Sequence, residues 1–186
     1  MGRIVFISHR HDDLVPTIIK RVPEAVALTS FKFEIQRGDI LCWLPTVNEY
    51  VDDEVQELAE LIDHSLFLPS KIVMLSIAGT ADDATNQQLQ EWYGQQATQT
   101  VLAHQYAVKM IDEFELPYTI IRALPITNEE TSLKVVSEGN PLEGKEIGLG
   151  QVAQIIEQAV TTDDFRNQSR LEAVVAVGHF DLHAVV

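Results

Sequence analysis

Short apolar runs alternate with helical patterns along the whole chain, and this alternation limits the possible fold more than any other feature. The strand-like runs are RIVFIS (3–8), AVALTS (25–30), DILCWL (39–44), KIVMLS (71–76), YTIIRA (118–123) and LEAVVAV (171–177). Helical patterns separate them, at residues 13–22, 52–65, 84–115 and 150–160. Continuous apolar strands alternating with helices predict an α/β fold with a doubly wound, mostly parallel sheet and helices on both faces. We expect one domain over residues 1–186.

Ligands of such folds bind at the carboxyl ends of the strands, near the point where the strand order reverses. The residues to consider therefore follow each predicted strand. They are residues 8–13, Ser30, and residues 45–47, 76–79 and 122–127.

Charge and cysteine content narrow the class of partner and compartment. The formal net charge is -15, which argues against nucleic acid or an anionic membrane as partner, because both require a basic face. The single cysteine, Cys42, lies in an apolar stretch and cannot form a disulfide within the chain, as expected in a reducing compartment. Neither a signal-peptide pattern nor an apolar run of membrane-spanning length occurs, so we expect a cytoplasmic protein.

Three stretches carry a resemblance to a known family. They are KIVMLSIAGT (71–80), FELPYTIIRALPITNE (114–129) and GKEIGLGQVAQIIEQAV (144–160). In order and spacing, the chain from about Asp39 onward resembles the atypical short-chain dehydrogenases, the NAD(P)H-binding, NmrA-like group with a Rossmann-like fold. The resemblance implies an oxidoreductase with NADP or NAD as cofactor.

The cofactor loop departs from the family pattern. In the family, the first strand ends in a glycine-rich turn that brings the backbone and a helix N-terminus close to the pyrophosphate. Here Ile7, Arg10 and Asp13 stand at the three glycine positions. The acidic side chains also repel phosphate, so we expect weak or absent dinucleotide binding in the usual pose. The resemblance places the cofactor-binding candidates at Ser8, His9, Arg10, His11 and Ser30.

The catalytic residues of the wider family are also altered. The usual tyrosine and lysine positions fall on Thr100 and His104. Ser76 is the best match for the active-site serine, and His104 could act as a general base if it faced the same crevice. Ser76 and His104 are therefore the predicted catalytic residues.

The spacing His9-x-His11-x-Asp13 also resembles part of a zinc motif of metallo-β-lactamase-like hydrolases. The position where that motif has its next histidine holds Leu14, and this interpretation ranks below the others. His179, Asp181 and His183 could add ligands if they lay close. Surface histidines are the alternative, and we assign no metal.

Two functions remain open. The first is an NAD(P)H-binding, oxidoreductase-like protein with an unknown small-molecule ligand. The second is a non-catalytic sensor or interaction protein that has kept the fold and lost standard dinucleotide binding. The apolar side chains of the predicted 84–115 helix suggest a homodimer.

Overall fold

The computed structural model describes residues 2–48, 50–162 and 172–177. Its main sheet has seven strands in the order β2-β1-β3-β4-β5-β9-β7. The strands are β2 (Val26–Leu28), β1 (Ile4–Ile7), β3 (Ile40–Trp43), β4 (Lys71–Ile77), β5 (Tyr118–Ala123), β9 (Glu172–Val177) and β7 (Ser132–Ser137). Every pairing is parallel except β7 with β9. The predicted doubly wound, mostly parallel α/β fold is confirmed.

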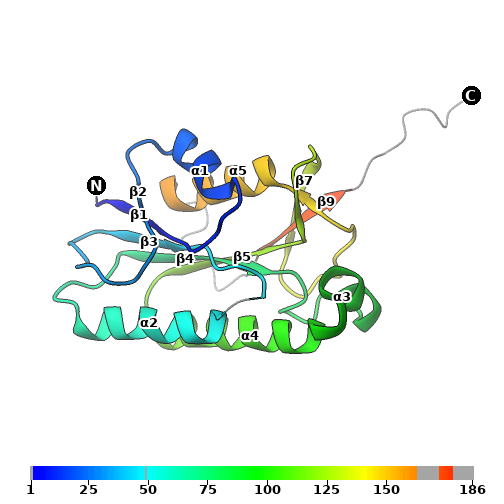
Figure 1. The fold of residues 1–186 in the computed structure, drawn as a ribbon, viewed down its shortest axis with the longest axis horizontal. Coiled ribbons are helices and arrows are strands. Elements are labelled where there is room, and N and C mark those ends of the chain that lie inside the picture. The colour runs from blue at the N-terminus through cyan, green and yellow to red at the C-terminus, as the bar shows by residue number, and fades with distance from the viewer. Residues whose placement is uncertain (1, 49, 163–171, 178–186) are drawn as a thin grey trace, which may run out of the picture.

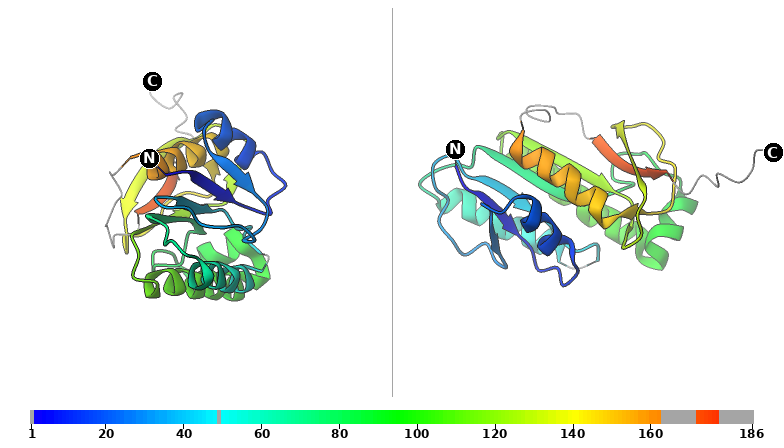
Figure 2. Two further views of the ribbon diagram at one scale, coloured as in Figure 1. Left: turned by 90° about the vertical axis from the view of Figure 1, so that its left-hand side faces the viewer. Right: turned by 90° about the horizontal axis from the view of Figure 1, so that it is seen from above.

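Helices cover both faces of this sheet (Figure 1). One face carries α1 (Leu14–Arg21) and α5 (Leu149–Thr161), which lie side by side in Figure 2. The other face carries α2 (Val51–His64) and α4 (Ala97–Glu113), which also pack together. Each helix buries an apolar stripe, and two buried clusters form the core, one on each side of the sheet.

The predicted 84–115 helix is wrong in one respect, because it is broken near its first third. It consists of α3 (Asn86–Tyr93), a 3₁₀ turn (Gly94–Gln96) and α4. Gly94 has a φ of 69°, in the left-handed region that glycine adopts without steric cost, and its N–H closes α3 on the carbonyl of Gln90. The break turns α3 across the carboxyl end of the sheet.

The stretch after β5 is more ordered than its polar sequence suggests. It contains β7 and a small two-stranded sheet of β6 (Ile126–Thr127) and β8 (Ile147–Gly148). These strands hold the residues that follow β5 against the start of α5.

The connection from β2 to β3 contains no helix, as the short interval between the two strand patterns predicts. Instead, Phe31 and Ile35 from this connection are buried in the same cluster as Leu58 and Leu61 of α2. The chain passes from β1 to β2 on one side and returns to β3 on the other, so the strand order reverses between β1 and β3. The carboxyl ends of β1 and β3 therefore mark the crevice where ligands of this fold bind.

Candidate functional site

The loop between β1 and α1 is tied to the end of β3 through Ser8. The Ser8 hydroxyl donates to the Leu44 carbonyl at 2.9 Å and accepts the backbone N–H of Arg10 at 3.1 Å. Ser8 is buried. Its polar groups are therefore used within the protein, at the point where the strand order reverses.

Arg10 and Asp12 form an ion pair across the start of α1. The Arg10 guanidinium donates to Asp12 through Nε, at 2.9 Å from Oδ2, and through Nη2, and its Nη1 donates to the Pro45 carbonyl at 2.9 Å. Asp12 also accepts the backbone N–H of Leu14, the first residue of α1. Burial by itself would raise the pKa of Asp12, but the hydrogen bond and the charge of Arg10 hold this pKa below its usual value. Asp12 is thus a carboxylate that occupies the helix N-terminus.

His9 points toward α2. Its Nδ1 lies 2.6 Å from Oε1 of Glu54, whose Oε2 accepts the indole N–H of Trp43 at 2.7 Å. The hydrogen bond to Glu54 raises the pKa of His9, since it stabilises the imidazolium. Glu54 and Trp43 are both buried, so His9 ties the loop to the protein interior.

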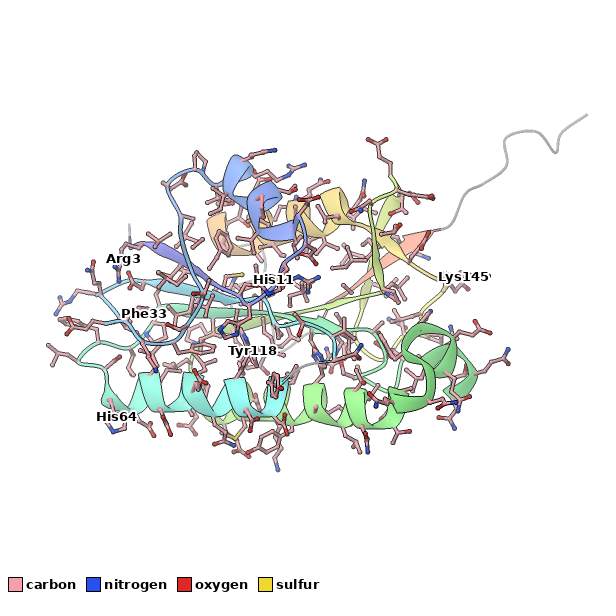
Figure 3. All side chains as sticks on the ribbon, viewed as in Figure 1. Arg3, His11, Phe33, His64, Tyr118 and Lys145 are labelled. Carbon is pink, nitrogen blue, oxygen red and sulfur yellow. The ribbon has the colours of Figure 1, made fainter. Side chains whose placement is uncertain are left out.

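The other two predicted cofactor residues lie apart from these contacts. His11 is exposed beside the start of α1 (Figure 3). Ser30 follows β2, which lies on the far side of β1 from β3, and its hydroxyl accepts the N–H of Lys32 at 3.4 Å. The structure therefore brings Ser8, His9 and Arg10 together in one loop, and their role in cofactor binding stays a prediction.

A dinucleotide pyrophosphate does not fit the loop in this arrangement. It would need free backbone N–H groups at the start of α1 and open space where glycines would stand. Here the N–H of Leu14 is bonded to Asp12, and the side chain of Arg10 lies across the loop toward Pro45. A second anion at this place would also meet the charge of Asp12.

A pocket of about 490 Å³ opens at the carboxyl ends of β4 and β5, next to this loop. We call it the C-edge pocket. Its lining residues are Arg10, Asp12, Val47, Asn48, Ile77, Trp92, Tyr93, Gly94, Ala123, Leu124, Pro125, Ile126, Asn128 and Leu149. Most of them come from four regions that the sequence singled out, residues 8–13, 45–47, 76–79 and 122–127, and the others include residues of α3 and the start of α5. A pocket of this size and apolar character is typical of a small-molecule site.

The aromatic wall of the C-edge pocket comes from α3. Trp92 and Tyr93 meet edge to face, with ring centroids 6.1 Å apart. The Tyr93 hydroxyl donates to the Ala78 carbonyl at 2.9 Å, and burial raises the pKa of this phenol. Tyr93 is thus held as a neutral phenol whose hydrogen is already donated.

The predicted catalytic residues Ser76 and His104 are in contact, with 3.2 Å between the Ser76 hydroxyl and His104 Nδ1. His104 Nε2 lies 3.2 Å from the Val47 carbonyl, so Nε2 carries the hydrogen and Nδ1 accepts from Ser76. Burial lowers the pKa of His104 to about 4, so the ring is neutral. Both side chains are 1% exposed and neither lines the C-edge pocket, whereas Val47 does. This geometry lets the pair position the pocket wall; direct catalysis by Ser76 and His104 stays a prediction.

Arg122 of β5 belongs to the same buried layer. Its Nε donates to the Thr80 hydroxyl at 2.6 Å, and its Nη2 lies 3.5 Å from Glu138. Burial lowers the pKa of Arg122 and raises that of Asp83 in the loop after β4. Arg122 therefore links this loop to the end of β7 and does not line the C-edge pocket.

Within residues 2–48, 50–162 and 172–177, no three His, Cys, Asp or Glu side chains gather closely enough to hold a metal ion. The metal-site interpretation of His9, His11 and Asp13 thus gains no support, and His179, Asp181 and His183 lie outside the described residues. None of the described helices has the length and apolar character needed to cross a membrane.

Comparison with known families identifies the C-terminal half. A family model described as NAD(P)H-binding matches residues 69–163, about half of the chain. The chain belongs to this NAD(P)H-binding family. The family expected from the sequence is confirmed, and so is an NAD(P)H-binding, oxidoreductase-like protein at the level of family and fold. The match begins just before β4, so it includes most of the C-edge pocket and leaves out the β1–α1 loop.

Solved structures support the fold. A short-chain dehydrogenase/reductase from Veillonella parvula in complex with NADP has a TM-score of 0.71 and 14% identity, with 100% of each chain covered. An oxidoreductase from Lactococcus lactis has a TM-score of 0.64 and 14% identity, with 94% of this chain and 91% of that chain covered. An anaerobilin reductase from Escherichia coli O157:H7 has a TM-score of 0.69 and 7% identity, with 95% and 98% covered. No curated protein sequence matches the chain significantly.

The sequence did not predict the part of the C-edge pocket that comes from helices. The predicted 84–115 helix has no break at Gly94 and therefore gives no reason to place Trp92 and Tyr93 at the sheet edge. Leu149 precedes the helical pattern of residues 150–160 by one position, whereas in the structure it is the first residue of α5. Gly94 was the available signal, since glycine often ends a helix.

Proposed function

We propose that this protein is an oxidoreductase-like member of the NAD(P)H-binding family that binds a small molecule in the C-edge pocket and binds NADPH and NADH weakly. One observation supports the weak nucleotide binding: the Arg10–Asp12 ion pair and its bonds to Leu14 and Pro45 use the groups that would hold a pyrophosphate. The family match and the pocket support the first part.

Calorimetric titration of NADPH and NADH tests the proposal. We expect dissociation constants of roughly hundreds of micromolar, equivalent to about 5 kcal/mol of binding free energy. Asn128→Trp should fill the C-edge pocket and block the small-molecule ligand, since Asn128 is exposed and lines the pocket. Gln90→Trp is the matched control, because Gln90 is exposed on α3 and does not line the pocket.

A low-micromolar dissociation constant for either nucleotide would contradict weak binding. Oxidation of NADPH or NADH in the presence of a panel of carbonyl and quinone acceptors tests the oxidoreductase part. Dependence of that rate on an open pocket, lost in Asn128→Trp and kept in Gln90→Trp, is the expected result.

A second candidate is a non-catalytic ligand sensor on the same fold. The pocket residues with ionisable side chains, among those described, are Arg10, Asp12 and Tyr93, and each is already bonded inside the protein. A proton-transfer group facing the ligand is therefore not evident among them. Failure of both nucleotides to bind at millimolar concentration, together with no turnover, would favour this candidate.

A further inference from the structure

An open groove of about 760 Å³ lies at the amino ends of β3 and β4, away from the C-edge pocket. We call it the N-edge groove, and it is lined by residues 31–36, Glu57, Glu60, Leu61 and residues 64–67. Its walls are the connection that precedes β3 and the end of α2, which precedes β4. In Figure 3, Phe33 and His64 lie toward the end of the molecule marked by Arg3, and Lys145 lies toward the other end.

The N-edge groove has an apolar floor and apolar side chains that reach solvent. Phe31, Ile35 and Leu61 are buried and form the floor. Leu66 is 88% exposed, the highest value for a large apolar side chain in the part of the chain that the structure describes. Phe33 is partly exposed. Apolar side chains that line an open groove in this way are typical of a surface that contacts another protein.

Internal hydrogen bonds hold both walls of the N-edge groove. The Ser65 hydroxyl donates to the Leu61 carbonyl at 2.6 Å and closes the last turn of α2. On the other wall, the Arg3 guanidinium donates to the Glu34 carbonyl at 3.0 Å. The groove is therefore formed before anything binds in it, which lowers the entropy cost of binding.

Carboxylates surround the apolar surface. Glu34, Glu57 and Glu60 line the groove and are exposed, and none of the ion pairs within residues 2–48, 50–162 and 172–177 includes their carboxylates. The basic side chains in the lining are Lys32 and His64. The C-terminal end of α2 adds partial negative charge, as helix C-termini do. The groove therefore favours a positively charged ligand.

We propose that the N-edge groove docks a basic, amphipathic segment of a partner protein. Apolar side chains of that segment pack on Leu66 and Phe33, and its lysines or arginines pair with the carboxylates. A second copy of this chain fits the groove less well, because a two-fold contact would bring the three carboxylates of each copy toward those of the other. The net charge of -15 adds to this repulsion.

Fluorescence anisotropy with a labelled peptide of three Lys-Leu-Phe-Lys units tests the proposal on the full chain. Two matched peptides separate charge from apolar contact: one has glutamate in place of lysine, and the other has serine in place of leucine and phenylalanine. In about 0.15 M salt, which screens non-specific attraction, we expect a dissociation constant of about ten micromolar for the basic, amphipathic peptide. Each matched peptide should bind roughly ten-fold or more weakly.

Substitutions place the peptide in the groove. Leu66→Ser should weaken binding roughly ten-fold without unfolding the protein, because Leu66 is exposed. Leu102→Ser is its control, since Leu102 is also exposed but lines a different groove, on α4.

The double substitution Glu57→Gln and Glu60→Gln should also weaken binding roughly ten-fold. Glu129→Gln with Glu130→Gln is the control, because it removes the same charge from exposed residues outside the groove. We expect this control to bind the peptide as the wild type does.

Three results would overturn the proposal. The first is no binding of the basic, amphipathic peptide at about 1 mM, and the second is equal affinity for all three peptides. The third is an equal loss of affinity in the groove variants and their controls, which would mean that the net charge attracts the peptide without a defined site. A change in oligomeric state of Leu66→Ser in light scattering would identify a second copy as the occupant and would contradict the proposal too. None of these results depends on nucleotide binding or on the C-edge pocket.

Discussion

The β1–α1 loop and the C-edge pocket share one edge of the sheet, but they satisfy their polar groups in different ways. The loop uses the ion pair of Arg10 with Asp12 and the hydrogen bond between His9 and Glu54. Beneath the pocket, the neutral Ser76–His104 pair is buried and leaves the apolar surface above it open. The two neighbouring regions therefore differ in how open they are: side-chain contacts cross the loop, whereas a pocket remains at the ends of β4 and β5.

The largest expected effect concerns the neutral layer under the pocket. Because burial lowers the pKa of His104 to about 4, the unfolded chain takes up a proton that the folded protein does not as the pH falls below 6.5. This group is therefore expected to cost the folded state roughly 3 kcal/mol between pH 6.5 and pH 4. Urea unfolding of the wild type and of His104→Gln at several pH values measures the difference between them.

His64→Gln serves as the control for that experiment, because His64 is exposed on α2. It should keep the pH dependence of the wild type. If His104→Gln kept it too, the neutral buried state of His104 would be wrong.

The next effect concerns the contacts of Glu54 with the loop and with Trp43. Glu54→Ala removes the acceptor of the buried Trp43 indole and the partner of His9. An unsatisfied buried donor predicts a loss of about 2 kcal/mol in the free energy of unfolding. Glu60→Ala, exposed on the same helix, should change stability by less than about 0.5 kcal/mol. Equal losses in both variants would contradict the importance of the Glu54 contacts.

A third experiment asks whether the closed loop limits nucleotide binding. The triple substitution Arg10→Gly, Asp12→Ala and Asp13→Gly removes the ion pair and restores two of the three expected glycines. We expect NADPH to bind about ten-fold more tightly by calorimetry, equivalent to about 1.4 kcal/mol. An unchanged dissociation constant would mean that the closed loop is not what weakens binding.

The smallest effect on stability concerns an exposed surface between α2 and α4. Leu102 is 58% exposed and Tyr106 40% exposed, and both line a groove with Asp52, Asp53 and Gln56. We expect a homodimer through this surface. Leu102→Glu should convert it to a monomer in light scattering, with less than about 0.5 kcal/mol change in the stability of each monomer. Leu66→Glu is the control and should leave the dimer intact, because Leu66 is 88% exposed but does not line this groove.

The fold could be predicted from the sequence because its central strands are buried on both faces and therefore mostly apolar, as in β4, where every residue is buried. β7 escaped prediction because it is an edge strand with exposed positions such as Lys134 and Val135, which leaves no apolar run to recognise. The break at Gly94 also escaped, since one glycine within a long polar helix is compatible with both outcomes.

For the site, the sequence located the loop and the strand ends but not the partners of their side chains. Residues 8–13 lie at the sheet edge as expected, yet His9 turns to Glu54 and Arg10 reaches Pro45, contacts between residues 45 and 35 positions apart. Contacts of this range depend on how helices pack on the sheet, and no local spacing encodes them.

The reactivity of the Cys42 thiol can report when the sheet around it opens. This thiol is fully buried in β3, which lies between β1 and β4 in the sheet. Burial raises the pKa of the thiol and so suppresses the reactive thiolate. Labelling by a thiol reagent should therefore proceed only through molecules in which the centre of the sheet has separated. Because the sequence has no other cysteine, the labelling rate reads the population of that open state directly, without any added probe.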